Sequence, residues 1–393
     1  MDKKKILLVS LGHLSCDING GALPAILPFL RAAYDLSYQA TGGLMFAYAC
    51  LSSMIQPLFG LLSDRFSKPW FIPLGVLLAG CGLAAIGWMP GYWGIFAAIG
   101  LSGVGAALFH PEGARFANAV SGQNKGTGMS LFSIGGNGGF VLGPLLATAC
   151  LGAFGLPGTT IFAVLAVLTA GTLVWSIARM GATKKTAAAG GKTAPATGAE
   201  GETPGENNWR EFLKLTVSIV TRSITFVGFN TFIPLYWVSA FGQSTATGAM
   251  ALTFFCVCGV ISNFFGGMLA DKFGYRAVIR VVFALMPPVV AGFSLSSNLY
   301  AAWALLPLLG FVLYAPFSAQ VVLGQQYLAK NIGFASGITL GLATSLGGVV
   351  APLLGWIADH YGMAATFQSL AALSIVGAVF AYLLKPVTVK KGK

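Results

Sequence analysis

Four ionisable side chains lie inside long apolar stretches of this chain, namely Asp17, Glu112, Arg115 and Arg222. An ionised group is expensive in hydrocarbon, so one that lies at membrane depth is a candidate functional residue. At a rise of about 1.5 Å per helical residue, Asp17 and Arg222 each lie roughly 16 Å along their stretches, near the middle of a bilayer. Two opposite charges at one depth predict a polar chamber inside the membrane.

The carboxylates among these residues are candidate proton carriers. Asp17 and Glu112 could bind and release protons in such surroundings, and His13 and His110 could relay them. A structural role is the alternative for each. Asp17 could be a partner of His13 or of the backbone, and Glu112 could pair with Arg115, three residues further along the same helix face.

Arg222 is the strongest candidate for binding an anion. No carboxylate lies near it in its own stretch, and a buried guanidinium needs a partner. Asp17 could be that partner in the empty protein, and an anionic small molecule could replace it, because a guanidinium matches a carboxylate or phosphonate. Other residues that could line the chamber, or instead bind a neighbouring helix, are Arg115, Asn19, Asn137, Asn230, Tyr236, Trp237, Tyr314 and Gln320.

The elements that carry these residues predict an all-α integral membrane protein. The 393 residues are 56% hydrophobic and only 9% charged, whereas soluble domains carry about 25% charged residues. The apolar stretches are long enough to span a bilayer, and there are too many of them to be buried core helices. We predict twelve transmembrane helices at about 6–30, 41–62, 71–89, 92–116, 127–151, 158–180, 211–238, 247–269, 277–297, 299–327, 333–357 and 363–386.

A polar segment divides the twelve predicted helices into two pseudo-symmetric sets of six. Residues 181–208 are rich in Gly, Ala, Thr, Pro and Lys and predict a flexible cytoplasmic linker between bundles at 1–180 and 209–393. The bundles repeat each other, because Pro144 and Pro352 occur 208 positions apart in similar contexts. Parallel repeats of this kind are typical of transporters whose substrate site lies between the halves.

The distribution of Lys and Arg predicts the orientation. With the termini on one side of the membrane, twenty Lys and Arg fall on that side and only Arg31 on the other. Positive residues concentrate on the cytoplasmic side, so both termini are predicted to be cytoplasmic. The positive residues that give the net charge of +12 then face the cytoplasm and anionic lipid headgroups. The charge therefore implies no nucleic-acid partner.

Two glycine-led motifs resemble signatures of the major facilitator superfamily. Residues 60–68, GLLSDRFSK, resemble its signature between the second and third helices, and residues 267–276 resemble a second copy. The resemblance implies a latch on the cytoplasmic side, in which glycines let helices touch and acidic and basic residues pair with each other and with helix ends. The implied gating residues are Gly60, Asp64, Arg65, Lys68, Gly267, Asp271, Lys272 and Arg276.

A narrower resemblance lies in the first half of the chain. Gly139, Gly143 and Pro144 resemble the antiporter signature of proton-driven drug exporters and are further candidate gating residues. Together with 12–30, the segments 107–115 (ALFHPEGAR) and 130–147 resemble the fosmidomycin resistance family of exporters. That resemblance implies proton-coupled efflux, and the family's phosphonate drug agrees with an anion at Arg222.

The sequence therefore predicts a monomeric inner-membrane exporter that exchanges protons for a small, anionic organic compound by alternating access. The alternatives are a proton-linked importer or anion exchanger for an organic acid and, more remotely, a channel or a sensor. An enzyme is disfavoured because the three histidines, at 13, 110 and 360, lack the spacing of a metal motif. We predict no metal and no cofactor, and we interpret the six cysteines as small buried hydrophobic residues.

Overall fold

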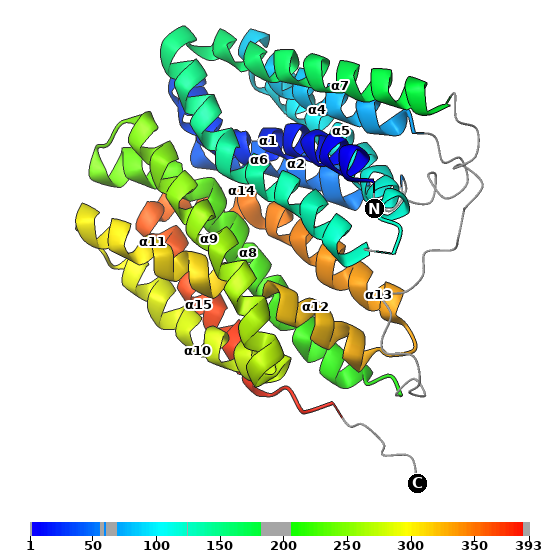
Figure 1. The fold of residues 1–393 in the computed structure, drawn as a ribbon. Helices are drawn as coiled ribbons and strands as arrows, with labels where there is room; N and C mark the ends of the chain where they lie inside the picture. The colour runs from blue at the N-terminus through cyan, green and yellow to red at the C-terminus, as the bar shows by residue number, and fades with distance from the viewer. Residues whose placement is uncertain (1, 56–58, 60–68, 124, 182–205, 388–393) are drawn as a thin grey trace. The chain divides into compact units, whose positions relative to one another are not determined.

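The computed structural model describes residues 2–55, 59, 69–123, 125–181 and 206–387, and every regular element among them is helical (Figure 1). Four predicted gating residues, Gly60, Asp64, Arg65 and Lys68, lie outside the described residues, as does most of the predicted linker at 181–208. The roles predicted for these segments stay predictions.

The helices before the linker correspond to the first six predicted spans. The second of these spans begins as α2 and continues into the π-helical turn η1. The elements are α1 (Lys3–Tyr34), α2 (Tyr38–Ala49), η1 (Cys50–Met54), α4 (Phe71–Ala85), η2 (Ile86–Trp88), α5 (Tyr92–Val120), α6 (Lys125–Phe154), η3 (Leu156–Thr159) and α7 (Thr160–Gly181).

The helices after the linker correspond to the last six predicted spans. The tenth span is divided between α11 and α12, and the eleventh contains a π-helical segment, η4, between α13 and α14. The elements are α8 (Trp209–Phe241), α9 (Thr245–Phe273), α10 (Tyr275–Ser294), α11 (Leu299–Tyr314), α12 (Pro316–Tyr327), α13 (Ile332–Ser336), η4 (Gly337–Leu342), α14 (Ala343–Tyr361) and α15 (Met363–Tyr382).

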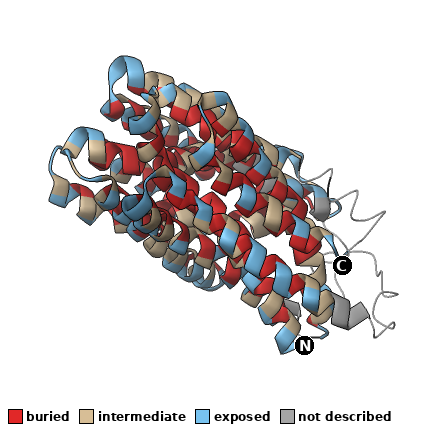
Figure 2. Cartoon of the chain, turned by 90° about the horizontal axis from the view of Figure 1, so that it is seen from above, coloured by how far each residue is buried: buried red, intermediate tan, exposed pale blue. Residues whose placement is uncertain are grey.

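Length and composition make these helices suitable for a bilayer. Among the described residues, ten helical segments are long and apolar enough to cross a membrane. Large apolar side chains such as Leu168 (63% exposed) and Phe264 (69% exposed) lie on the outside, and Figure 2 shows exposed positions on the outer helix faces. Such exposure would be an aggregation hazard in water and is expected in lipid. The predicted all-helical membrane architecture is confirmed.

The chain packs as two compact units. The first comprises Met1–Ala182, Asn230–Cys256 and Gly348–Met363, and the second comprises Thr183–Phe229, Val257–Gly347 and Ala364–Lys393. The predicted division into bundles at 1–180 and 209–393 stays a prediction.

Glycines hold α1 against α6 in the first unit. A Cβ atom at Gly21 would lie 2.6 Å from the Cα atom of Phe140, one at Gly139 would lie 2.6 Å from the backbone nitrogen of Ile18, and one at Gly143 would lie 2.5 Å from the Ile18 carbonyl oxygen. Only glycine permits backbones to approach this closely. The predicted close contact at Gly139 and Gly143 is therefore present, with Pro144 inside α6, although a role in gating stays a prediction.

An acidic side chain caps a helix elsewhere in the first unit. The two carboxylate oxygens of Asp359, near the end of α14, each accept a hydrogen bond of 2.8 Å, from the backbone nitrogens of Tyr38 and Gln39. These are amides of the first turn of α2, which have no acceptor within their own helix, and a negative charge also suits a helix N-terminus. Asp359 therefore ties α14 to the beginning of α2.

Aromatic packing forms part of the core of the second unit. The ring of Phe229 lies 5.2 Å from that of Phe293 and 4.9 Å from that of Phe367, and the last two rings lie 5.1 Å apart. All three side chains are fully buried. They join α8, α10 and α15, and so support the part of α8 that carries Arg222.

Candidate transport site

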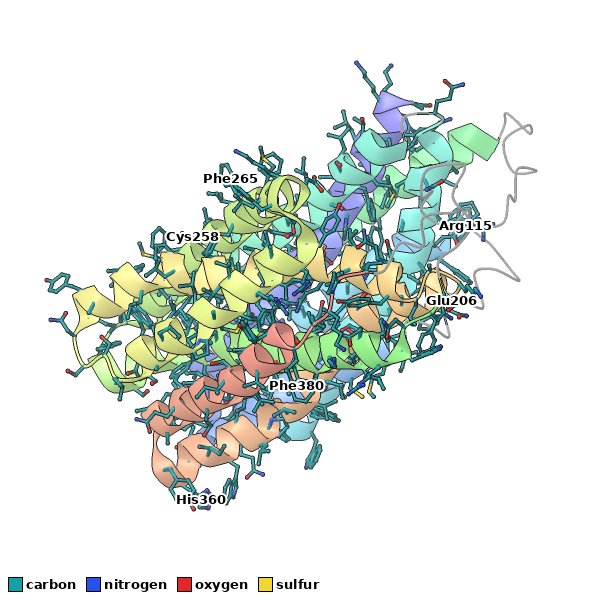
Figure 3. All side chains as sticks on the ribbon, turned by 90° about the horizontal axis from the view of Figure 1, so that it is seen from below. Arg115, Glu206, Cys258, Phe265, His360 and Phe380 are labelled. Carbon is teal, nitrogen blue, oxygen red and sulfur yellow. The ribbon has the colours of Figure 1, made fainter. Side chains whose placement is uncertain are left out.

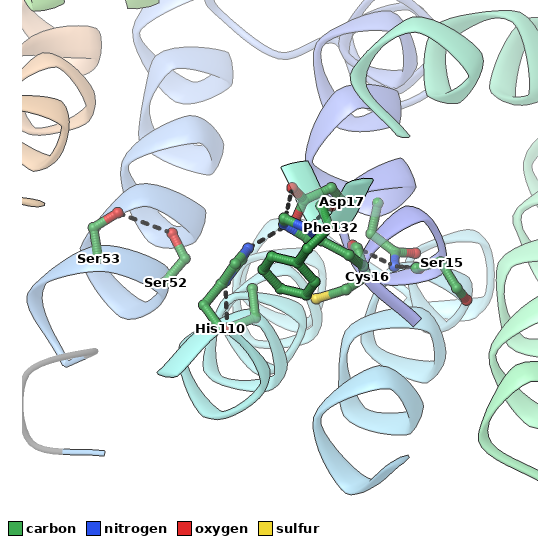
Figure 4. Close-up of polar contacts among 10 residues, drawn as sticks. Ser15, Cys16, Asp17, Ser52, Ser53, His110 and Phe132 are labelled. Carbon is green, nitrogen blue, oxygen red and sulfur yellow. Dashed lines mark hydrogen bonds and ion pairs between the residues drawn. The ribbon is translucent and has the colours of Figure 1, made fainter. Parts of the chain in front are cut away.

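Asp17 is the centre of a buried cluster with two histidines (Figure 4). His13 precedes it by one helical turn on α1, and its Nε2 atom lies 3.1 Å from Oδ2 of Asp17. His110 comes from α5, and its Nε2 atom lies 2.9 Å from Oδ1 of the same carboxylate. The structure thus brings together three of the four residues predicted to handle protons.

Backbone carbonyls orient both imidazole rings. The Nδ1 atom of His13 lies 2.8 Å from the Phe132 carbonyl oxygen, and Nδ1 of His110 lies 2.7 Å from that of Ala106. A carbonyl oxygen only accepts hydrogen bonds, so each Nδ1 atom must carry a hydrogen. In a neutral ring Nε2 would then present a lone pair to Asp17. Each Nε2–carboxylate contact becomes a hydrogen bond only when a proton lies between the two atoms.

The number of protons on the cluster therefore decides which of its contacts are hydrogen bonds. With one added proton on each Nε2 atom, both contacts to Asp17 are hydrogen bonds; with fewer, at least one lone pair faces a carboxylate oxygen. The ligand atoms of the three residues lie within 4.8 Å of one another, which a metal ion could also bridge. The distances of 2.9 and 3.1 Å are those of hydrogen bonds, and the predicted role of the cluster in carrying protons stays a prediction.

The surroundings of the cluster are tight on one side and more open on the other. The ring of His13 stacks on that of Phe132 at a centroid distance of 4.0 Å. A Cβ atom at Gly136 would lie 2.6 Å from Nε2 of His13 and 2.7 Å from Oδ2 of Asp17. The His110 side chain is 28% exposed, against 9% for Asp17, so His110 is the more accessible of the two.

Glu112 and Arg115 lie further along α5. Glu112 is buried, with 4% exposure, and Arg115 is partly exposed (Figure 3). Their predicted roles in proton transfer, in substrate binding or as an ion pair stay predictions. The third histidine, His360, is exposed at the end of α14, where Nδ1 bonds to the Trp356 carbonyl oxygen (Figure 3).

Arg222 is buried in the second unit, with 5% exposure. Its Nε atom donates to Oε1 of Gln320 and its Nη1 atom donates to the Leu313 carbonyl oxygen, each at 2.8 Å. The Phe317 ring centroid lies 5.5 Å from the guanidinium carbon. Among the described residues of its own unit, no carboxylate forms an ion pair with Arg222. Within this unit an amide oxygen and a carbonyl oxygen, both neutral, accept hydrogen bonds from Arg222. The predicted pairing with Asp17, which lies in the other unit, stays a prediction.

The bond from Arg222 fixes the orientation of the Gln320 amide. An Nε–H group can only donate, so the Gln320 oxygen must face it and the amide nitrogen must point elsewhere. That nitrogen is buried and has no hydrogen-bond partner among the described residues. An unsatisfied buried donor costs about 1–3 kcal/mol, and a ligand oxygen would satisfy it.

The remaining predicted lining residues differ in their surroundings. The Asn19 amide nitrogen bonds to the carbonyl oxygens of Ser15 and Cys16 in its own helix, whereas its amide oxygen is buried and has no hydrogen-bond partner among the described residues. Asn137 is exposed on α6, and Trp237 is fully buried. Asn230 is also buried, and its amide nitrogen lies 3.9 Å from the Cys256 Sγ atom. The Tyr314 ring packs against that of Phe226. Their roles in binding stay predictions.

The second glycine-led motif differs in detail from the prediction. A Cβ atom at Gly267 would have its nearest neighbour 4.0 Å away, whereas one at Gly266 would lie 2.2 Å from the Ala315 carbonyl oxygen. The close helix contact is therefore made by Gly266. Asp271 accepts a hydrogen bond from the Tyr275 hydroxyl, and Lys272 lies over the Phe273 ring; both are exposed.

Helices suited to crossing a bilayer, with a carboxylate–histidine cluster and a guanidinium buried among them, are typical of a membrane transporter. Comparison with known proteins agrees, because the model of the Major Facilitator Superfamily matches residues 9–352. The chain belongs to the major facilitator superfamily.

Relatives extend over nearly the whole chain. The Fosmidomycin resistance protein of Escherichia coli (strain K12) is 28% identical over 375 residues, which cover 95% of this chain and 91% of that protein. An uncharacterised MFS-type transporter of Bacillus subtilis (strain 168), YfnC, is 28% identical over 394 residues, which cover 96% of this chain and 92% of that protein. The resemblance to the fosmidomycin resistance family thus extends beyond the first half, where the sequence motifs had indicated it.

Solved structures share the fold. A bacterial homologue of the human lysosomal transporter Spinster, in an inward-facing and occupied conformation, matches with a TM-score of 0.78 at 15% identity, covering 96% of each chain. The nucleoside transporter NupG, solved as a mutant, matches with a TM-score of 0.73 at 13% identity, covering 97% of this chain and all of that one. At these identities the likeness concerns the fold alone.

Proposed function

We propose that the protein is a proton-coupled exporter of small anionic organic compounds that works by alternating access. The observation that carries the proposal is the arrangement of Asp17 between two imidazole Nε2 atoms whose rings are oriented by backbone carbonyls. Such an arrangement changes from attractive to repulsive when its protons leave. Proton loading can therefore bias the conformation of the helices that contribute the residues.

The cluster lies where such a change would be transmitted. Asp17 lies next to Ile18, whose backbone nitrogen would lie only 2.6 Å from a Cβ atom at Gly139. A movement of α1 caused by repulsion at Asp17 must therefore shift α6 as well, because the two backbones leave no space for independent motion. Glu112, buried on α5, is a second candidate proton carrier.

The substrate charge is inferred from Arg222 and Gln320. Arg222 retains its positive charge beside two neutral acceptors, and Gln320 adds an unsatisfied N–H donor. Both available groups donate, so the complementary ligand group has several acceptor oxygens, as a carboxylate or phosphonate has. The name of the Fosmidomycin resistance protein supports export of a drug-like molecule, and that of the Tetracycline resistance protein, class C, which matches 40% of the chain at 29% identity, supports it further.

Charge distribution supports the proposed orientation. Twenty Lys and Arg on the predicted cytoplasmic side against Arg31 on the other favour cytoplasmic termini in the bacterial inner membrane. We further propose that the monomer is the transporting unit.

The coupling is tested in proteoliposomes with an imposed pH gradient and a radiolabelled organic anion. We expect the gradient to drive accumulation in the wild type and to have no effect in the Asp17→Asn, Glu112→Gln double variant. Gradient-independent transport by the wild type, or full coupling in the double variant, would show that coupling is assigned wrongly. Drug susceptibility of cells that overexpress the protein tests direction, because an exporter raises resistance and an importer lowers it.

A further inference from the structure

A cavity of about 660 Å³ lies at the beginning of α10, in the second unit. It is open to the outside and is lined by the end of α9, the first two turns of α10, one face of α12 and the segment after α15. In Figure 1 this segment, drawn in red, leaves α15 beside α10. The lining includes Phe273, Arg276, Arg280, Val281, Leu323 and Gln326.

Two guanidinium groups give the cavity a positive charge. Arg280 donates from Nη2 to the carbonyl oxygens of Tyr382 and Leu384, which are neutral acceptors. The Nε atoms of Arg276 and Arg280 are both buried and have no hydrogen-bond partner among the described residues. None of the described residues that line the cavity is acidic.

Two acidic groups near the cavity are not among its lining residues and already have partners. Asp271 accepts from the Tyr275 hydroxyl and is exposed. Glu211 on α8 accepts from Nζ of Lys214 and from the backbone nitrogen of Lys385. Two positive charges in one cavity therefore face no counter-charge among its lining residues, and an anion would be favoured there.

The outer side of the cavity is apolar. Phe273 and Val281 line it and are each 60% exposed, and Leu285, one turn after Val281 on the same face of α10, is 45% exposed. Such a stripe leads from the charged cavity along a helix suited to crossing a membrane. A soluble anion would leave these side chains uncovered, whereas the acyl chains of a lipid would cover them.

We propose that this cavity binds the phosphate headgroup of an anionic phospholipid from the cytoplasmic leaflet, with acyl chains along the apolar face of α10. Basic pockets between membrane helices on the cytoplasmic side attract such headgroups. The end of α10 that carries the cavity lies on the side where Lys and Arg are concentrated. This site is separate from Asp17 and Arg222 and does not depend on the transported substrate.

The test is a lipid titration of the purified full-length protein in neutral detergent, followed by native mass spectrometry. The ligands are phosphatidylglycerol, phosphatidylcholine with the same acyl chains, and inorganic phosphate. We expect phosphatidylglycerol to bind at least tenfold more tightly than phosphatidylcholine, and Arg276→Gln to weaken its binding about fivefold. Ala277→Trp, which fills the cavity without changing charge, should weaken it as well.

Lys330→Gln is the matched control, because it removes one positive charge from an exposed residue outside the cavity lining. Arg276 makes no hydrogen bond among the described residues, so its replacement should leave the fold intact, and thermal unfolding without lipid checks this. Equal affinity for the two lipids would overturn the proposal. The proposal would also be overturned if Arg276→Gln, Ala277→Trp and Lys330→Gln all bound phosphatidylglycerol equally well. Displacement of phosphatidylglycerol by an equal concentration of inorganic phosphate would overturn it too.

Discussion

His110 is held between two acceptors, with Nε2 at 2.9 Å from Asp17 Oδ1 and Nδ1 at 2.7 Å from the Ala106 carbonyl oxygen. Both ring nitrogens face oxygen, an arrangement that suits a doubly protonated imidazole. Whether the contact between Nε2 and Asp17 is a hydrogen bond therefore depends on whether a proton lies between the two atoms. Because Asp17 lies on α1 and His110 on α5, a proton shared between them would hold the two helices together.

The Asp17→Asn variant should abolish proton coupling while leaving the helices folded. An amide is close to isosteric with the carboxyl group but has no negative charge to hold protons on the histidines. We expect gradient-driven transport to fall at least tenfold and the remaining exchange of substrate to lose its dependence on pH. The measurement is uptake into proteoliposomes at several pH values. A pH profile unchanged from that of the wild type would rule out Asp17 as the carrier.

Gly136→Ala should impair transport through sterics alone. Its Cβ atom would lie 2.6 Å from His13 Nε2 and 2.7 Å from Asp17 Oδ2, so the two side chains would have to separate. We expect at least a tenfold loss of proton-coupled transport. Gly152→Ala is the matched control on the same helix, because its Cβ atom would meet nothing within 4 Å. Equal activities of the two alanine variants would contradict the importance of the His13–Asp17 contact.

Gln320→Glu should weaken the binding of an anionic substrate. The new carboxylate would pair with Arg222, neutralise it internally and remove the unsatisfied N–H donor. We expect KM for an anion to rise at least tenfold, equivalent to about 1.4 kcal/mol or more of binding free energy. Proton binding at Asp17 should persist, measured as proton uptake by the detergent-solubilised protein. An unchanged KM would show that the anion binds elsewhere.

Hydropathy allowed the spans to be predicted because a bilayer imposes a length and an apolar composition on each helix. The spacing of His13 and Asp17, one turn apart, also indicated a contact. The proximity of His110 could not be predicted, since it depends on how α5 packs against α1. Nor could the carbonyl of Phe132, which orients His13, because backbone groups leave no signal in side-chain patterns.

The partner of Arg222 shows the same limit. The sequence indicated that a buried guanidinium needs a partner, and Asp17 was the natural candidate by charge. Within the second unit, Arg222 donates to Gln320 on α12 and to the Leu313 carbonyl oxygen on α11, and its pairing with Asp17 stays a prediction. Gln320 was predicted only as one of several residues that could line a chamber. Its orientation, and hence its unsatisfied donor, follows from three-dimensional contacts.

The glycine pair at 266–267 provides a final prediction, in which neighbouring residues should behave oppositely. A Cβ atom at Gly266 would lie 2.2 Å from the Ala315 carbonyl oxygen, so Gly266→Ala must displace α9 from the α11–α12 junction. Overpacking of this kind destabilises by about 1–3 kcal/mol. Gly267→Ala has 4.0 Å of space and should be neutral or slightly stabilising, because alanine favours a helix over glycine. Thermal unfolding in detergent should therefore give a lower Tm for Gly266→Ala alone. If Gly267→Ala were the more destabilising variant, the close contact would lie at the residue that the family motif indicates, and α9 would pack through Gly267 instead of Gly266.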